Sequence, residues 1–127
     1  MNLLLDTHIL IWAAKGELPI EAAKYVEDIN NTLFFSPASI WEVVIKSRLG
    51  RKDFIIDPFS LYRGLIDAGY EELEITGRHT LLVSTLPLLH KDPFDRILLA
   101  QSVSVEIALL TADEIISQYP GPIIFVR

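Results

Sequence analysis

Short apolar runs alternate along this sequence with longer stretches in which apolar residues recur every three or four positions. Leu3 to Leu5 form the first run, and Ile107 to Thr111 form a later one. Runs of this length suit strands buried on both faces, whereas the longer spacing is typical of amphipathic helices. The alternation predicts an α/β fold in which a central parallel sheet lies between two layers of helices.

Three helix starts are marked by a capping residue followed directly by proline, at Ser36-Pro37, Asp57-Pro58 and Asp92-Pro93. Ser and Asp side chains accept from free N–H groups of the first turn, and proline tolerates the first helical position. Gly50 and Gly69 are the expected ends of the first two helices. We also expect helices near 7–14, 20–29 and 113–118, and strands near 32–35, 72–75 and 123–126.

Length and composition favour one globular domain spanning residues 1–127. Half of the residues are hydrophobic and the mean hydropathy is +0.35, which excludes a disordered chain. Charged residues interrupt every apolar run before it could span a bilayer, and the first residues do not resemble a signal peptide. We therefore expect a cytoplasmic protein.

The absence of cysteine excludes disulfides, thiolate metal sites and cysteine nucleophiles, so any chemistry uses oxygen and nitrogen groups. A net charge of −6 is unfavourable for binding nucleic acid by overall charge. The phosphate backbone meets local potential, however, and basic residues gather in two segments. These residues are Lys46, Arg48, Arg51 and Lys52 in the first segment, and His90, Lys91 and Arg96 in the second.

Two acids follow predicted strands. Asp6 closes the first strand, and Asp113 comes shortly after the strand that ends at Thr111. The carboxyl ends of parallel strands share one edge of a sheet, where the sites of such folds gather. A helix-capping role would also explain each of these two acids.

Three further acids lie within or at the start of predicted helices. Glu42 is surrounded by apolar residues, where a carboxylate needs a partner or a metal, although an exposed pair with Lys46 is an alternative. Asp92 and Asp95 share one helix start, which a capping arrangement could also explain. Clustered carboxylates favour a divalent cation, and Mg²⁺ fits best, with Mn²⁺ as a substitute. No sequence typical of a Walker loop, a zinc protease or a serine hydrolase is present.

Four segments, in this order, resemble the signature blocks of PIN domains, and of the VapC-like toxins in particular. They are LLLDTH at 3–8, SPASIWE at 36–42, HKDPFDR at 90–96 with LAQ at 99–101, and LTAD at 110–113. The resemblance implies a three-layer α/β/α fold and cleavage of RNA phosphodiester bonds with carboxylate-held Mg²⁺ or Mn²⁺. It also implies that the protein is the toxin of a type II toxin–antitoxin system, with an antitoxin partner and a homodimeric state.

The resemblance assigns roles to particular residues. It implies that Asp6, Glu42 and Asp95 bind metal and that Asp113 is the fourth catalytic acid. Asp92 is a supporting residue that caps the helix or contacts metal, and Thr111 would orient a water. Basic candidates for the RNA backbone are Arg96, Lys46 and Arg48, although ordinary solvated or ion-paired side chains would also explain them.

Two other functions are compatible with these features. One is a non-catalytic PIN-like binding module, which the presence of acids in all four segments argues against. The other is a metal-dependent phosphatase for small phosphoesters. Such an enzyme would normally carry a second Asp two residues after the first, and His8 stands there. The RNA that would be cleaved is not indicated by the sequence.

Overall fold

A computed structural model describes all residues from 1 to 127 and contains five strands and six α-helices. The strands are β1 (Asn2–Leu5), β2 (Thr32–Phe35), β3 (Glu71–Glu72), β4 (Ala108–Thr111) and β5 (Ile123–Phe125). The helices are α1 (Thr7–Lys15), α2 (Ile20–Val26), α3 (Pro37–Arg48), α4 (Pro58–Asp67), α5 (Gly77–Leu82) and α6 (Pro93–Val105). Three short 3-10 turns, η1 (Lys52–Phe54), η2 (Val83–Thr85) and η3 (Ile116–Gln118), complete the chain.

All five strands are parallel and lie in the order β3-β2-β1-β4-β5. From β1 the chain builds outward through β2 to β3, and then crosses back to place β4 on the other side of β1. Strand order therefore reverses between β1 and β4. In open α/β sheets, ligands bind at the carboxyl ends of the strands that flank such a reversal.

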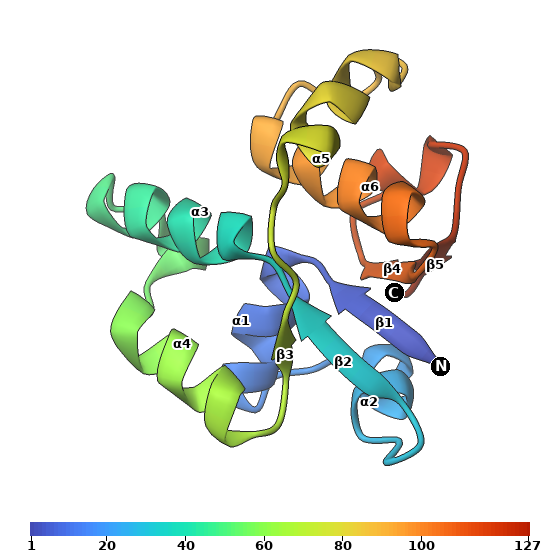
Figure 1. The fold of residues 1–127 in the computed structure, drawn as a ribbon. Helices are drawn as coiled ribbons and strands as arrows, with labels where there is room; N and C mark the ends of the chain where they lie inside the picture. Colours follow the sequence, from blue (N-terminus) through green and yellow to red (C-terminus); the bar gives the residue numbers. More distant parts are fainter.

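The sheet is covered on both faces, which confirms the predicted three-layer architecture (Figure 1). Side chains alternate across β1, so that Leu3 and Leu5 join a core with α1 and α4 on one face. Leu4 points to the opposite face and packs with Leu98 and Leu99 of α6. All three leucines of β1 are fully buried, as expected for a central parallel strand.

The predicted helix starts are confirmed by their caps. The Ser36 hydroxyl accepts from the Ala38 N–H at 3.1 Å, the Asp57 carboxylate accepts from the Ser60 N–H at 2.9 Å, and the Asp92 carboxylate accepts from the Phe94 N–H at 2.9 Å. Local hydrogen bonds therefore position α3, α4 and α6 at their first residues.

The structure corrects three boundaries. The helix predicted for 20–29 ends at Val26, because the Asp28 carboxylate accepts from the Asn30 N–H at 2.9 Å and closes a turn instead. The strand predicted at 72–75 is the short, exposed edge strand Glu71–Glu72. The helix predicted for 113–118 is reduced to the 3-10 turn η3, and the Asp113 carboxylate accepts from the amides of residues 115 and 116 at its start.

Helix α5 is absent from the prediction. It spans six residues and begins with glycine, so its periodicity is too short to recognise. Its start is a reciprocal cap between Thr76 and His79, in which each residue's side chain accepts from the other's backbone N–H. No helix of the protein is long and apolar enough to cross a membrane.

Candidate active site

Asp6 and Thr111 lie side by side at the carboxyl ends of β1 and β4. Asp6 is 3% exposed and caps α1 by accepting from the Ile9 N–H at 3.0 Å. Its other carboxylate oxygen accepts the hydroxyl hydrogen of Thr111, and that hydroxyl oxygen accepts from the Asp113 N–H at 3.0 Å. Thr111 thus supports the site by donating its hydroxyl hydrogen to Asp6 and by accepting from the Asp113 backbone.

Burial raises the pKa of Asp6, although hydrogen bonds from Thr111 and Ile9 oppose the increase. A carboxylate that is removed from water favours its neutral form unless a cation compensates its charge. Asp6 is therefore the N-cap of α1 and also a buried acid, whose negative charge a bound cation would stabilise.

Asp95, Asp113 and His90 form the tightest group of potential metal ligands. One ligand atom from each of these residues lies within 4.8 Å of the others. The imidazole Nε2 of His90 is 3.1 Å from Asp95 Oδ2 and 3.1 Å from Asp113 Oδ2. Asp6 and Glu42 do not belong to this group. The structure therefore brings the third and fourth predicted acids together around a histidine that the sequence analysis treated only as a basic neighbour.

The hydrogen bonds of His90 determine its tautomer, that is, which ring nitrogen carries the hydrogen. The backbone N–H of Asp92 donates to His90 Nδ1 at 3.1 Å, so the neutral ring carries its hydrogen on Nε2. Nε2 then donates to Asp113. In a metal-bound histidine, the ring nitrogen that does not bind the metal normally donates a hydrogen bond. If Nε2 of His90 bound a metal, that nitrogen would be Nδ1, which here accepts from the Asp92 N–H. In this geometry His90 donates to Asp113 and is not itself a ligand.

Glu42, Lys46 and Asp92 form the second part of the site, where α3 packs against α6. The ammonium Nζ of Lys46 lies 2.6 Å from Glu42 Oε2 and 2.8 Å from Asp92 Oδ2. Burial lowers the pKa of Lys46, but the hydrogen bonds to Asp92 and Glu42 outweigh it and raise the pKa overall. The predicted i,i+4 pair is therefore present, yet Glu42 is 2% exposed and is not the exposed residue of the alternative interpretation.

The pKa of Asp95 reflects the charges of all the other acids of the site. Burial and the negative charges of Asp92, Glu42, Asp6 and Asp113 raise the pKa of Asp95 to about 8. Burial is the largest cause of this shift, and the charges of the other four acids add to it because these acids lie near Asp95. The acids from four separate segments thus converge on one region at the carboxyl edge of the sheet.

The residues of this region fit a hard divalent cation. Glu42 Oε1 is buried and has no hydrogen-bond partner, so a carboxylate oxygen remains available for an ion. Mg²⁺ and Mn²⁺ take oxygen ligands, and one or two direct carboxylates suffice because these ions keep bound waters. Without an ion, the buried and unpaired Glu42 Oε1 would destabilise the folded protein, because it has lost its contacts with water.

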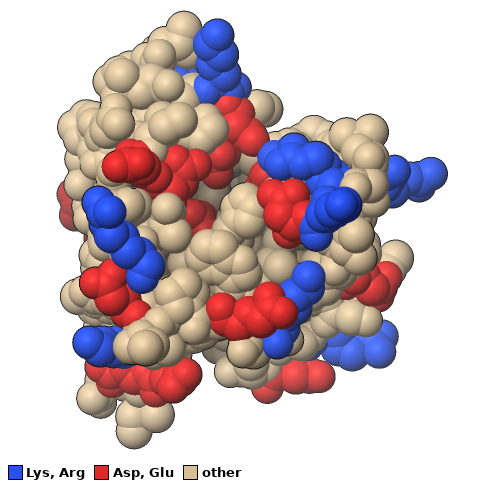
Figure 2. Space-filling model, turned by 180° about the vertical axis from the view of Figure 1, so that it is seen from behind, with Lys and Arg blue, Asp and Glu red and all other residues tan.

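The basic residues predicted to contact RNA have different surroundings. Arg96 donates to the backbone carbonyls of Val83 and Pro87, each at 3.0 Å, and therefore ties the start of α6 to the η2 loop. Lys46 is engaged with two acids, as described above. Arg48 is exposed at the end of α3. On the face drawn in Figure 2, Lys and Arg are scattered among Asp and Glu and form no continuous basic patch.

Tyr119 is a supporting residue that the sequence analysis missed. It is 5% exposed, and its hydroxyl oxygen accepts from the Leu89 N–H at 3.2 Å and from the His90 N–H at 2.7 Å. Arg96 Nη1 lies 3.3 Å from the same oxygen. Tyr119 therefore holds the loop that carries His90. A tyrosine near the chain end offers no sequence signal for a contact with residues 29 and 30 positions earlier.

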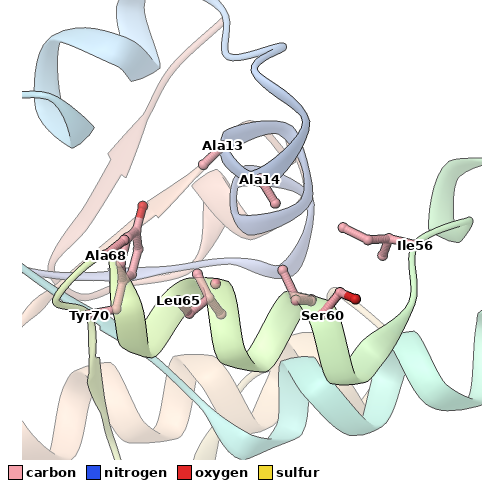
Figure 3. Close-up of a pocket in the computed structure, with 9 residues that line it drawn as sticks. Ala13, Ala14, Ile56, Ser60, Leu65, Ala68 and Tyr70 are labelled. Atoms are coloured by element: carbon pink, nitrogen blue, oxygen red, sulfur yellow. The ribbon is translucent and has the colours of Figure 1, made fainter.

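A cavity of about 340 Å³ lies apart from the acids, between α1 and α4. Figure 3 shows that its walls carry small and apolar side chains, with Ala13 and Ala14 on α1 and Leu65 and Ala68 at the α4 side. The cavity contains none of the acids, so it has no part in the candidate metal site.

Comparison with protein families gives one match, which covers most of the chain. The family model of the PIN domain matches residues 3–122. No curated protein matches the chain.

Solved structures share the fold at low sequence identity. VapBC2 from Rickettsia felis bound to a DNA fragment from their promoter gives a TM-score of 0.75 at 16% identity, covering 100% of both chains. DNA-bound VapBC from Salmonella typhimurium gives 0.70 at 14% identity, covering 98% of each chain. A toxin-antitoxin complex from Klebsiella pneumoniae gives 0.66 at 18% identity, covering 96% of this chain and 95% of the other. At these identities the likeness establishes a common fold.

Proposed function

Because this chain belongs to the PIN domain family, we propose that it is a metal-dependent endoribonuclease and the toxin of a type II toxin–antitoxin pair. Its substrate is RNA, and its cofactor is Mg²⁺, for which Mn²⁺ substitutes. The observation that carries the proposal is the gathering of acids from four segments at one edge of the sheet, linked through Thr111, His90 and Lys46. Two of these acids, Asp6 and Glu42, are buried, and one carboxylate oxygen of Glu42 has no partner.

The roles of the acids follow from their positions. Asp6, Glu42 and Asp95 hold the cation, and Asp113 completes the acidic set beside Asp95. A bound divalent cation supplies a Lewis acid that polarises the phosphodiester and lowers the pKa of water. Thr111 positions the Asp6 carboxylate by donating to it. His90 donates from Nε2 to Asp113, and the same nitrogen lies 3.1 Å from Asp95 Oδ2. Asp92 acts as the cap of α6 and as a partner of Lys46.

The assignment to a toxin–antitoxin pair is supported by the solved structures with the same fold, which are VapBC complexes and a toxin-antitoxin complex. An antitoxin partner also suits the exposed surface of α4. Phe59, Tyr62 and Ile66 are exposed large side chains on this helix, whose other face borders the cavity against α1. Apolar helix faces of this kind accept amphipathic segments.

Cleavage of total RNA by the purified protein, freed of any antitoxin, tests the proposal. We expect new RNA ends in the presence of Mg²⁺ or Mn²⁺ and none with chelator. Asp95→Asn and Asp6→Asn should abolish cleavage while the variants keep the melting transition of a folded protein, because each removes a carboxylate of the metal site. Mapping of the new ends would then identify the cleaved RNA.

A matched control is Asp57→Asn. Asp57 caps α4 as Asp6 caps α1, but it is exposed and lies outside the acid cluster, and Asn is an equally good cap. This variant should retain full activity. Full activity of Asp95→Asn and Asp6→Asn would refute the nuclease proposal. Metal-independent binding of an antitoxin, together with no cleavage of any RNA, would support a non-catalytic module instead.

A further inference from the structure

Lys46 lies on α3, and its ammonium is placed between two acids. Its ammonium lies 2.6 Å from Glu42 on its own helix and 2.8 Å from Asp92 at the start of α6. It therefore bridges two carboxylates from different segments, as a metal ion would. The lysine is also the only basic side chain that forms an ion pair with either acid.

Aromatic rings hold this ammonium in place. Nζ lies 4.9 Å from the ring centroid of Phe54 and 5.6 Å from that of Phe94. A cation over an aromatic face is attracted by the ring, and more strongly when it is shielded from water. Only 15% of the Lys46 side chain is exposed. Two acids and two rings therefore fix the ammonium inside the site, and it is not a mobile surface charge.

Glu42 connects this bridge to the rest of the acid cluster. One carboxylate oxygen accepts from Lys46, and the other is buried without a partner. Glu42 can therefore face a fixed ammonium with one oxygen and a divalent ion with the other. Asp6, Asp95 and Asp113 provide the other carboxylates of the proposed metal site, which does not include Asp92.

We propose that Lys46 is a built-in counter-cation, which holds the place between Glu42 and Asp92 and thereby limits the site to one divalent ion. In sites that bind two metals, the ions are about 4 Å apart and share carboxylates between them. Here the ammonium already neutralises one side of Glu42, so a second divalent ion would have to displace it. This inference rests on the proposed metal-dependent function.

Lys46→Met tests the proposal, because methionine keeps much of the length and apolar stem of lysine and removes its charge. We expect calorimetric titration with Mn²⁺ to give one ion per chain for the wild type and two for Lys46→Met. In the electron paramagnetic resonance spectrum, only the variant should show a coupled pair of Mn²⁺ ions. Without metal, the variant should melt at a lower temperature than the wild type, because Glu42 and Asp92 lose their partner.

Two control variants separate this effect from a general change of charge. Lys91→Met removes an exposed lysine next to Asp92 and should leave the stoichiometry at one. The double variant Lys46→Met with Asp92→Asn should return to one ion, because it removes a ligand of the second position and keeps the α6 cap.

The outcomes distinguish the two proposals. Two Mn²⁺ ions in the wild type would overturn the counter-cation role and leave the nuclease proposal standing. One ion in the folded Lys46→Met variant would also overturn this role. No binding of Mn²⁺ or Mg²⁺ to the wild type would overturn the metal-dependent function itself. If Lys46→Met does not fold, Lys46→Gln, which also lacks the ammonium and keeps a polar end, takes its place in the titration, and one ion bound to that variant would overturn the role.

Discussion

The hydroxyl of Thr111 donates a hydrogen bond to the carboxylate of Asp6 across a separation of 105 residues. Both side chains are buried, and both stand where a central strand ends. The contact joins β1 to β4 at the point where strand order reverses. It therefore connects the stability of the sheet to the position of a proposed metal ligand.

Thr111→Val should destabilise the protein and weaken metal binding. Valine has the shape of threonine but leaves a buried carboxylate oxygen and the Asp113 N–H without their partner, which costs about 1–3 kcal/mol. Thr111→Ser keeps the hydroxyl and should recover most of the affinity for Mn²⁺. Denaturant unfolding and Mn²⁺ titration measure the two effects. Equal affinities for the valine and serine variants would show that the hydroxyl does not position Asp6.

Asp95 should make the stability of the metal-free protein depend on pH. Its pKa is about 8 in the folded protein and about 4 in an unfolded chain, so the folded state holds the proton more tightly. The corresponding stabilisation is complete below pH ~4 and is lost as the pH rises through ~8, by at most about 1.4 kcal/mol per pH unit.

The comparison that isolates this effect is the free energy of unfolding of the wild type minus that of Asp95→Asn, measured with chelator between pH 4 and 9. Asparagine does not titrate, so the difference should decrease from about pH 4 to about pH 8 and then level off. A difference that stays flat would contradict the raised pKa of Asp95.

Mg²⁺ should raise the melting temperature of the wild type, because an ion that binds only the folded state stabilises it. The gain reaches about 2.7 kcal/mol when the free ion is at one hundred times its dissociation constant. Asp95→Asn should lose most of this gain, whereas Asp57→Asn, an exposed cap outside the site, should keep it. Thermal melts with Mg²⁺ and with chelator measure the gain. A wild-type melting temperature that ignores Mg²⁺ would argue against a metal site.

Tyr119→Phe should loosen the loop that carries His90. The variant loses the oxygen that accepts from the amides of Leu89 and His90, at a cost of about 1–2 kcal/mol. Hydrogen exchange should accelerate at these two amides, and unfolding by denaturant should occur at lower concentration. Tyr62→Phe is the matched control, since Tyr62 is exposed and donates only to Glu72, so its effect should stay within about 0.5 kcal/mol. Similar losses in both variants would contradict this role.

The sequence by itself determined the order of the elements and most of their starts. Caps at Ser36, Asp57 and Asp92 act through bonds to amides only two or three residues away, so local sequence is sufficient to predict them. The placement of Asp6 and Asp113 at one edge also follows from the sequence. Parallel strands align their carboxyl ends, whatever the details of side-chain packing.

Only the tertiary structure decided which side chains meet across long separations. Lys46 bridges to Asp92, 46 residues later, because α3 docks against α6, and Arg96 turns to backbone carbonyls that α5 and η2 bring near it. The bond of Tyr119 to the His90 loop depends on the same packing. Such contacts have no local signal, since long side chains have many rotamers and the docked neighbours select one of them.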